Sequence, residues 1–261
     1  MKTLRVAQIT DIHLQAEIGS KLHGVDTAVT LGEVIGAIKQ LSPVPDLVIV
    51  TGDLAEDGSK ATYQRLRKML AKTRLPVYVL AGNHDDIDEM QRSLVGGNIY
   101  FKSMLRLDEW AFMFVNTRVE GEPFGWIDSQ EQLLLESNLS SVEDLSVLLA
   151  LHHSPMAICS SAGCQLKNAE EFTRLVESFP RVKAVIGGHT HTAAEKKNKS
   201  HTQFTSPSSF AQVLHDQPKD INAPQGFWET HRLQQASHGF RVLDLHPGGQ
   251  ISSELHWPGA D

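Results

Sequence analysis

Five short segments place aspartate, asparagine or histidine directly after a run of apolar residues. They are D-I-H at 11–13, G-D at 52–53, G-N-H-D-D at 82–86, H-H at 152–153 and G-H-T-H at 188–191. The side chains offer carboxylate and amide oxygens and imidazole nitrogens, with no thiolate among them. Such a set suits manganese, iron, cobalt or zinc, and holds too many imidazoles for a plain magnesium or calcium site. The residue types therefore predict a site for first-row metal ions.

The number of donors indicates two ions. The candidate ligands are Asp11, His13, Asp53, Asn83, His152, His189 and His191. Seven ligands are too many for one ion with open positions, but they suit two ions that share a carboxylate, a known arrangement for phosphoryl chemistry. Each segment alone is weak evidence, since G-D, for example, is also an ordinary turn signal. The five segments in order carry the prediction, against the alternative of unrelated turn residues and structural histidines.

A parallel sheet would bring these segments together. Residues 26–41 and 59–73 have helical patterns with Asp26 and Ser59 as N-caps, and they alternate with the first apolar runs. This β-α-β-α-β order implies parallel strands with right-handed crossovers, whose carboxyl ends share the edge where ligands bind. The runs that predict buried strands are 4–10, 46–52, 76–82, 145–153 and 183–188.

The remaining chain is expected to complete one domain over residues 1–261. Residues 99–107 and 110–116 predict an antiparallel pair, and residues 128–139 and 168–179 predict helices, the second capped by Asn168. From about residue 192 the pattern is rich in strands and ends in a hairpin turned by Pro247, Gly248 and Gly249.

Composition limits the classes of partner. The 261 residues are 41% hydrophobic and carry a formal charge of −7 without a basic block, which disfavours a nucleic acid polymer as partner. No apolar run approaches the ~18 residues of a membrane span, and residues 1–10 lack the apolar region of a secretory signal. We therefore expect a cytoplasmic protein without a membrane partner, in which Cys159 and Cys164 are reduced thiols. A homodimer is compatible with the sequence.

The ordered motifs resemble those of the calcineurin-like metallophosphoesterases. Within that superfamily the chain resembles the class III 3′,5′-cyclic nucleotide phosphodiesterases of the bacterial cyclic-AMP type, from about residue 4 to residue 256. The stretches that carry the resemblance are QITDIHL, GDLAEDGSKATYQ, LKNAEEFTRLVESFPRVKAVIGGHTH and RVLDLHPGG. The resemblance implies an α/β fold, a four-layer α/β/β/α sandwich of two mixed sheets flanked by helices. It also implies a small-molecule cyclic nucleotide as substrate.

The resemblance also implies a role for each ligand. It implies two divalent ions, iron or manganese, with zinc or cobalt as alternatives. The first ion would be held by Asp11, His13 and His191, and the second by Asn83, His152 and His189. Asp53 would bridge the two ions. The resemblance favours His152 over His153, a choice that spacing alone leaves open. His84 would face the phosphate as catalytic acid, and the substrate contacts would come from His13, Asp53, Asn83, His84 and His191.

The implied reaction is hydrolysis of cyclic AMP to 5′-AMP by a hydroxide held between the metals. The alternatives are another small phosphodiester or monoester, such as a glycerophosphodiester or a 2′,3′-cyclic nucleotide, and a non-catalytic scaffold of the same fold. Ser154 replaces the proline usual in such enzymes, which leaves the substrate range open. Asp85 is expected to orient His84 or to serve the turn, Asp86 to cap the next helix, and Glu56 and Asp57 to cap their loop. Residues 214–238 are candidates for a cap over the site.

Overall fold

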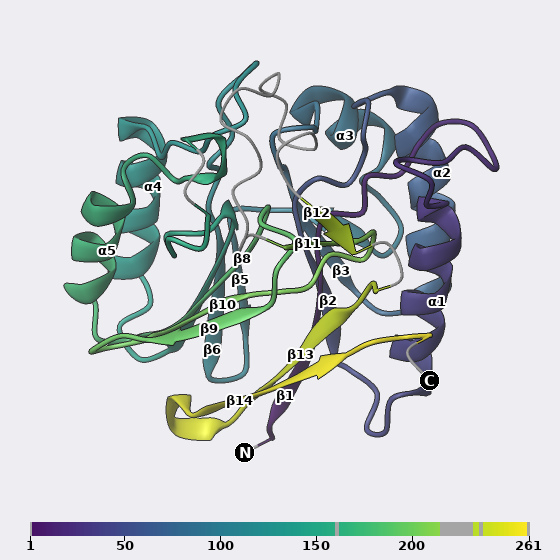
Figure 1. Cartoon of the computed structure of the whole chain (residues 1–261). Coiled ribbons are helices and arrows are strands. Elements are labelled where there is room, and N and C mark those ends of the chain that lie inside the picture. The colour runs from purple at the N-terminus through teal and green to yellow at the C-terminus, as the bar shows by residue number, and fades with distance from the viewer. Residues whose placement is uncertain (1, 160–161, 215–231, 235–236, 260–261) are drawn as a thin grey trace.

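The fold is a sandwich of two β-sheets with helices on both outer faces, as Figure 1 shows. The computed structural model describes residues 2–159, 162–214, 232–234 and 237–259. Helices α1 and α2 cover one sheet, and α4 and α5 cover the other, on the opposite side of the molecule. The expected four-layer α/β/β/α arrangement is confirmed.

The first sheet has the strand order β14-β13-β1-β2-β3-β4. Strands β1 to β4 run parallel, and the C-terminal hairpin of β13 and β14 adds to β1 in the antiparallel direction. Its elements are β1 Leu4–Ile9, α1 Thr27–Gln40, β2 Leu47–Thr51, α2 Lys60–Leu70, the 3-10 turn η1 Ala71–Thr73, β3 Val77–Leu80, α3 Ile87–Ser93, β4 Ile99–Phe101, β13 Phe240–Leu245, η3 Pro247–Gly249 and β14 Ile251–His256.

The second sheet has the strand order β5-β6-β7-β8-β10-β9, with β6, β7, β8 and β10 parallel. A separate pair, β11 with β12, lies outside both sheets. The elements of this half are β5 Met104–Leu107, β6 Trp110–Phe114, α4 Ser129–Ser140, β7 Ser146–His153, η2 Ala162–Cys164, α5 Ala169–Glu177, β8 Val182–Gly188, β9 Ala194–Lys197, β10 Thr202–Thr205, β11 Gln212–Leu214 and β12 Arg232–Gln234.

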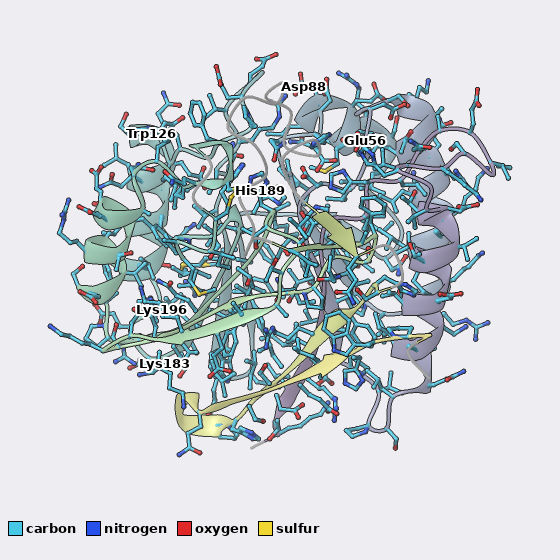
Figure 2. The ribbon with its side chains drawn as sticks, in the orientation of Figure 1. Glu56, Asp88, Trp126, Lys183, His189 and Lys196 are labelled. Carbon is cyan, nitrogen blue, oxygen red and sulfur yellow. A yellow bond between two sulfur atoms is a disulfide. The ribbon has the colours of Figure 1, made fainter. Side chains whose placement is uncertain are left out.

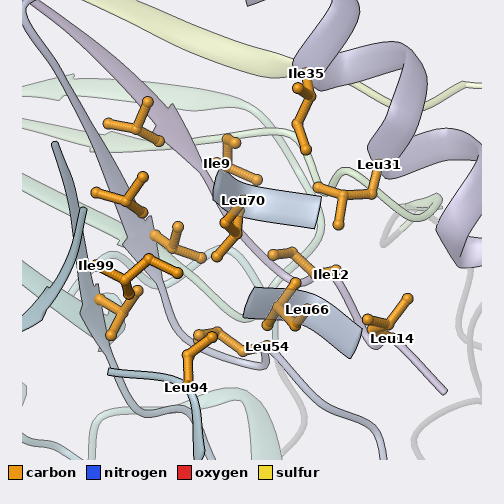
Figure 3. Packing of buried hydrophobic residues seen from close by; sticks show 14 of the residues in the cluster. Ile9, Ile12, Leu14, Leu31, Ile35, Leu54, Leu66, Leu70, Leu94 and Ile99 are labelled. Atoms are coloured by element: carbon orange, nitrogen blue, oxygen red, sulfur yellow. The ribbon is translucent and has the colours of Figure 1, made fainter. Parts of the chain in front are cut away.

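Alternation along the strands divides the apolar residues between layers. In β2, Val48 and Val50 belong to the cluster under α1 and α2, whereas Leu47 and Ile49 belong to the cluster between the sheets. Figure 3 shows the first cluster, where Leu31 projects from α1 toward the sheet. Because both faces of β2 are buried, the strand reads as a continuous apolar run.

Most expected elements are present, within a few residues of their expected ends. Asp26 and Ser59 accept hydrogen bonds from backbone N–H groups of α1 and α2, so both N-caps are confirmed. The expected hairpin turn is also confirmed, as η3 between β13 and β14.

Two local expectations are wrong. Residues 99–107 are not one antiparallel strand, because β4 pairs in parallel with β3 whereas β5 pairs with β6 in the other sheet. The chain changes sheets at Lys102 and Ser103, and apolar periodicity does not report which sheet a strand joins. Asn168 stands at the N-cap position of α5, but its amide bonds the backbone N–H and carbonyl of Ile127 instead.

Among the described residues, no helix combines the length and apolar character needed to cross a bilayer.

Candidate metal centre

The five motif segments meet at the carboxyl-terminal edge of the two sheets. His189 and Glu56 lie at this end of the molecule, with Lys183 and Lys196 toward the opposite end (Figure 2). Eight described non-glycine residues have a positive φ, and five of them belong to the motifs: Asp11 at 51°, His13 at 47°, Asp53 at 49°, His189 at 69° and His191 at 49°. A left-handed backbone costs such residues about 1–2 kcal/mol each, and this strain gathers at functional sites. The backbone of these turns therefore directs the motif side chains toward a common site.

The first cluster consists of Asp11, His13 and His191, all buried, with ligand atoms within 4.8 Å of one another. His191 Nε2 lies 3.1 Å from His13 Nε2 and 3.6 Å from Asp11 Oδ1. The Asp11 carboxylate is held by the backbone N–H of His189, at 2.9 and 3.1 Å. Two imidazoles and a carboxylate thus converge on one point.

The outer ring nitrogens of these histidines fix their tautomers. His191 Nδ1 donates to the carbonyl of Ala211 at 2.9 Å, so the hydrogen is on Nδ1 and the Nε2 lone pair faces His13. His13 Nδ1 bonds the Glu56 carboxylate at 2.7 Å, an arrangement common behind metal-bound histidines. Two Nε2 lone pairs at 3.1 Å would repel each other, so either a proton on His13 Nε2 or a bound cation must lie between them. A divalent cation fits this requirement.

The second cluster is built from Asn83, His152 and His189 around Asp53. His152 Nε2 lies 3.2 Å from Asn83 Oδ1 and 3.3 Å from Asp53 Oδ2, while its Nδ1 donates to the carbonyl of Thr51 at 2.8 Å. The ring of His189 lies 5.0 Å from that of His152, between centroids. His152 thus turns one nitrogen inward and anchors the other.

The choice between His152 and His153 follows from their partners. His153 Nδ1 bonds the Thr117 hydroxyl at 2.8 Å, and its Nε2 donates to the carbonyl of Pro123 at 3.2 Å. Both ring nitrogens of His153 are therefore engaged by the protein, although its ring lies only 4.4 Å from that of His189. His153 can still join His152 and His189 in a metal-ligand group, but its protein contacts make His152 the better candidate of the two.

Asp53 lies between the two clusters. Its Oδ2 is 3.6 Å from His13 Nε2 and 3.3 Å from His152 Nε2, and it can join a ligand group with either histidine. Burial alone would raise the pKa of Asp53, but His152, His84 and His13 together lower that pKa well below its ordinary value. The carboxylate is therefore ionised and placed to contact a cation on either side.

The turn at residues 82–86 brings the candidate ligand Asn83 and the candidate acid His84 to one place. A Cβ at Gly82 would lie 2.2 Å from Asp53 Oδ1, so only glycine permits this approach. Asp85 serves the turn, because its carboxylate accepts from the backbone N–H of Gly82 at 2.9 Å and from that of Leu54 at 3.1 Å. Asp86 accepts from the N–H of Glu89, so its expected role as helix cap is confirmed.

His84 is the accessible imidazole of this turn. Its side chain is 27% exposed, whereas those of His13 and His152 are 1% and 0% exposed. Its backbone N–H donates to Asp53 Oδ1 at 3.0 Å, and its ring lies 4.8 Å from that of His13. A side chain in this position can contact both solvent and a molecule bound at the clusters.

Glu56 has a place that the sequence did not reveal. It was expected to cap its loop, as Asp57 does by accepting from the N–H of Ser59 and the hydroxyl of Thr62. Instead Glu56 Oε2 lies 2.7 Å from His13 Nδ1 and 3.4 Å from His84 Nδ1. The signal for this role is a carboxylate three residues after Asp53, which is too common a spacing to identify it.

The expectation of reduced thiols is wrong. Cys159 and Cys164 form a disulfide with their Cα atoms 6.0 Å apart. Cys164 is the last residue of the turn η2, and the C-x4-C spacing alone does not define the geometry that brings the two cysteines together. The expected cap within residues 214–238 falls almost entirely outside the described residues.

The electrostatics of the site match a metal-binding role. Burial lowers the pKa of His189 to about 3, and His191 is likewise held well below its ordinary pKa, so both imidazoles are neutral. Burial raises the pKa of the Asp11 carboxyl to about 6. Burial also lowers the pKa of His152, but Asp53 and Asp11 raise it to about 9, so this imidazole must lose a proton before it can bind a metal ion. Imidazole nitrogens, carboxylates and an amide oxygen are borderline and hard donors, which suit first-row divalent ions.

Comparison with known proteins places the chain in a family. Residues 4–193 match the family model of the calcineurin-like phosphoesterases. The chain belongs to this calcineurin-like phosphoesterase family. The family implies divalent metal ions, and the two clusters described above could hold such ions.

Relatives of known sequence narrow the comparison. Over 260 residues the chain is 31% identical to the protein of Escherichia coli K12 named 3′,5′-cyclic adenosine monophosphate phosphodiesterase CpdA, covering 97% of this chain and 89% of that protein. The protein of the same name from Vibrio vulnificus is 30% identical over 256 residues, with the same coverage. These homologues, which align over nearly the full length of the chain, are named as cyclic-nucleotide phosphodiesterases.

Solved structures support the fold alone. A dimetal phosphatase from Danio rerio superposes with a TM-score of 0.65 at 14% identity, covering 98% of this chain and 99% of that one. GAP50, described as the anchor in the inner membrane complex of Plasmodium, also gives 0.65 at 14% identity, covering 99% and 85%. The metallophosphoesterase fold thus occurs in proteins with quite different descriptions, so the side chains must decide the function.

Proposed function

We propose that this protein hydrolyses 3′,5′-cyclic nucleotides, cyclic AMP to 5′-AMP, at a centre of two divalent metal ions. The observation that carries the proposal is the pair of donor clusters on either side of Asp53, in a chain whose full-length relatives are named cyclic-AMP phosphodiesterases. Asp11, His13 and His191 would hold one ion, and Asn83, His152 and His189 the other. Asp53 would bridge them.

The chain supports this assignment through the groups behind the ligands. Glu56, Thr51 and Ala211 each accept from the Nδ1 of a different histidine, which turns the Nε2 lone pairs of His13, His152 and His191 inward. When bound, the two ions supply Lewis-acid stabilisation of the phosphate charge and lower the pKa of a water toward neutrality. Asp11 and Asp53 contribute two negative charges against the four positive charges of two divalent ions, so the loaded site would keep a net positive charge that can bind an anionic phosphodiester.

His84 is proposed as the general acid. Its Nδ1 lies near Glu56, 3.3 Å from the backbone oxygen and 3.4 Å from the carboxylate, and this contact leaves Nε2 to face the substrate. As a hydroxide ion forms a bond to phosphorus and the bond from phosphorus to the 3′ oxygen breaks, Nε2 would donate its proton to that departing oxygen. General acid catalysis of this kind contributes about 10²–10⁴-fold. The proposed substrate contacts are made by His13, Asp53, Asn83, His84 and His191.

Substrate profiling after metal reconstitution tests the proposal. The metal-free chain is loaded with manganese or iron and assayed on cyclic AMP, its 2′,3′ isomer and glycerophosphocholine at equal concentrations. The proposal predicts the highest kcat/KM on cyclic AMP, with 5′-AMP as product. Faster turnover of either rival would reassign the enzyme to another small phosphodiester, and no turnover of any substrate would leave a scaffold of the kind that shares this fold.

Variants connect that activity to the assigned residues. Asp53→Asn should abolish turnover and reduce the bound metal, because the bridging carboxylate loses its charge. His246→Gln is the matched histidine control, since His246 bonds Thr3 and Ser252 beside the C-terminal hairpin. It should leave turnover unchanged. Full activity in Asp53→Asn would contradict the bridging role even if cyclic AMP is the substrate.

A further inference from the structure

A disulfide closes a short loop beside the second cluster. Cys159 and Cys164 are 6% and 4% exposed, and they lie in the connection between β7 and α5. The bond joins two residues separated by five positions. Within the turn η2, Gly163 directly precedes Cys164 in the chain. The position of the Gly163 backbone is thus tied to the disulfide.

Gly163 contacts a proposed metal ligand directly. Its carbonyl accepts a hydrogen bond from His189 Nε2 at 3.0 Å. Because a carbonyl can only accept, this bond places the hydrogen on Nε2 and leaves Nδ1 as the unprotonated nitrogen of His189. The other three histidine ligands are fixed the opposite way, through Nδ1. His189 is therefore oriented by the disulfide loop, while its backbone N–H holds Asp11.

Hydrogen bonds hold the chain on both sides of the two cysteines. After Cys164, the Gln165 carbonyl accepts from the N–H of Gly125 at 2.9 Å, and the N–H of Lys167 donates to the Gly125 carbonyl at 2.9 Å. Before Cys159, the N–H of Ile158 donates to the carbonyl of Met156, and the N–H of Met156 donates to the hydroxyl of Ser154. Gly163 is adjacent to Cys164, so its carbonyl is held by the disulfide together with the segment that bonds Gly125, and loss of the disulfide removes one of these two supports.

We propose that the Cys159–Cys164 disulfide is a positioning element of the second metal site, which holds the Gly163 carbonyl against His189 and makes metal binding respond to thiol–disulfide exchange. The inference rests on the proposed metal centre. In the exchange, a dithiol reductant gives two electrons and two protons to the S–S bond, which yields two thiols, and the reductant becomes a disulfide. The Gly163 to His189 hydrogen bond then loses its covalent support.

Metal titration of the full chain tests this inference. The metal-free protein is titrated with Mn²⁺ by calorimetry in three forms: oxidised wild type, wild type reduced by a phosphine that is removed before an anaerobic titration, and Cys159→Ser/Cys164→Ser. The oxidised form should bind two ions. In both other forms one affinity should be unchanged, and the other should fall by about 10–100-fold, the usual cost of losing a group that orients a ligand.

A double-mutant cycle separates positioning from general structural support. In a His189→Ala background, removing the disulfide should produce no further loss of Mn²⁺ affinity, because the residue through which it acts is gone. Thermal unfolding of the metal-free forms reports on folding, and the reduced wild type serves if the serine variant is unfolded. Equal affinities with and without the disulfide, or an equal loss in the His189→Ala background, would overturn the inference. Oxidised wild type that binds fewer than two ions would instead overturn the dinuclear centre itself.

Discussion

Replacing Gly82 with alanine tests how closely the turn that carries Asn83 and His84 must approach Asp53. The added Cβ would lie 2.2 Å from Asp53 Oδ1 and 2.3 Å from the Asp53 backbone nitrogen. Ordinary contact begins at 3.4 Å, so the two segments must separate by about 1 Å. The Asp53 side chain alone cannot relieve this, because the second clash involves its backbone nitrogen.

The separation acts on the proposed centre from both sides. It breaks the 3.0 Å hydrogen bond from the His84 N–H to Asp53 Oδ1, and it moves Asn83 relative to His152. A misplacement of about 1 Å in an active site can cost about 10²-fold in rate. We therefore expect Gly82→Ala to lower kcat/KM on cyclic AMP by about 10²-fold and to reduce the manganese retained after gel filtration.

Gly36→Ala is the matched control. Gly36 lies within α1, where an added Cβ meets nothing within 4 Å, and alanine there should stabilise the helix by about 0.5–1 kcal/mol. Its kinetics and metal content should equal those of the wild type, and its thermal midpoint should rise. A Gly82→Ala protein with wild-type rate and metal content would refute the reasoning that this approach positions Asp53.

Three further predictions address the groups around the metals. Glu56→Gln should weaken one of two Mn²⁺ affinities by about 10–100-fold in calorimetry, because His13 loses its carboxylate partner; unchanged affinities would contradict the orienting role. His84→Gln should lower kcat by about 10²–10⁴-fold while metal content, measured by atomic emission, stays constant; a parallel loss of metal would instead make His84 a ligand. Metal affinity should fall about tenfold per pH unit from pH 9 downward and more steeply below pH 6, as followed by titration at several pH values. In the metal-free chain, burial lowers the pKa of His152, but Asp53 and Asp11 raise it to about 9; burial raises the pKa of Asp11 to about 6. His152 and Asp11 must therefore each release a proton when a metal ion binds below these pH values. A metal affinity that does not change with pH would contradict both pKa shifts.

The positions of the strands, and with them the convergence of the motifs, could be predicted from the sequence. Runs such as LVIVT are buried on both faces, so they are continuous in the sequence and easy to recognise. The caps at Asp26 and Ser59 are local interactions, and local patterns report them well. The order of donors after successive strands then placed them at one edge.

What the sequence did not contain was the second layer of contacts. The geometric argument for His152 over His153 as the proposed ligand rests on the hydrogen bonds of His153 with Thr117 and Pro123, which lie 36 and 30 positions away in the chain. Glu56 reaches His13 across a separation of 43 residues. The split between β4 and β5 and the disulfide likewise depend on tertiary placement, which periodicity and cysteine spacing do not encode.

Anomalous diffraction at the manganese edge, from crystals of the reconstituted protein, tests the central claim most directly. The account predicts two peaks, one contacted by Asp11, His13 and His191 and the other by Asn83, His152 and His189, with Asp53 oxygens bound to both. A single peak, or ions bound away from Asp53, would contradict it.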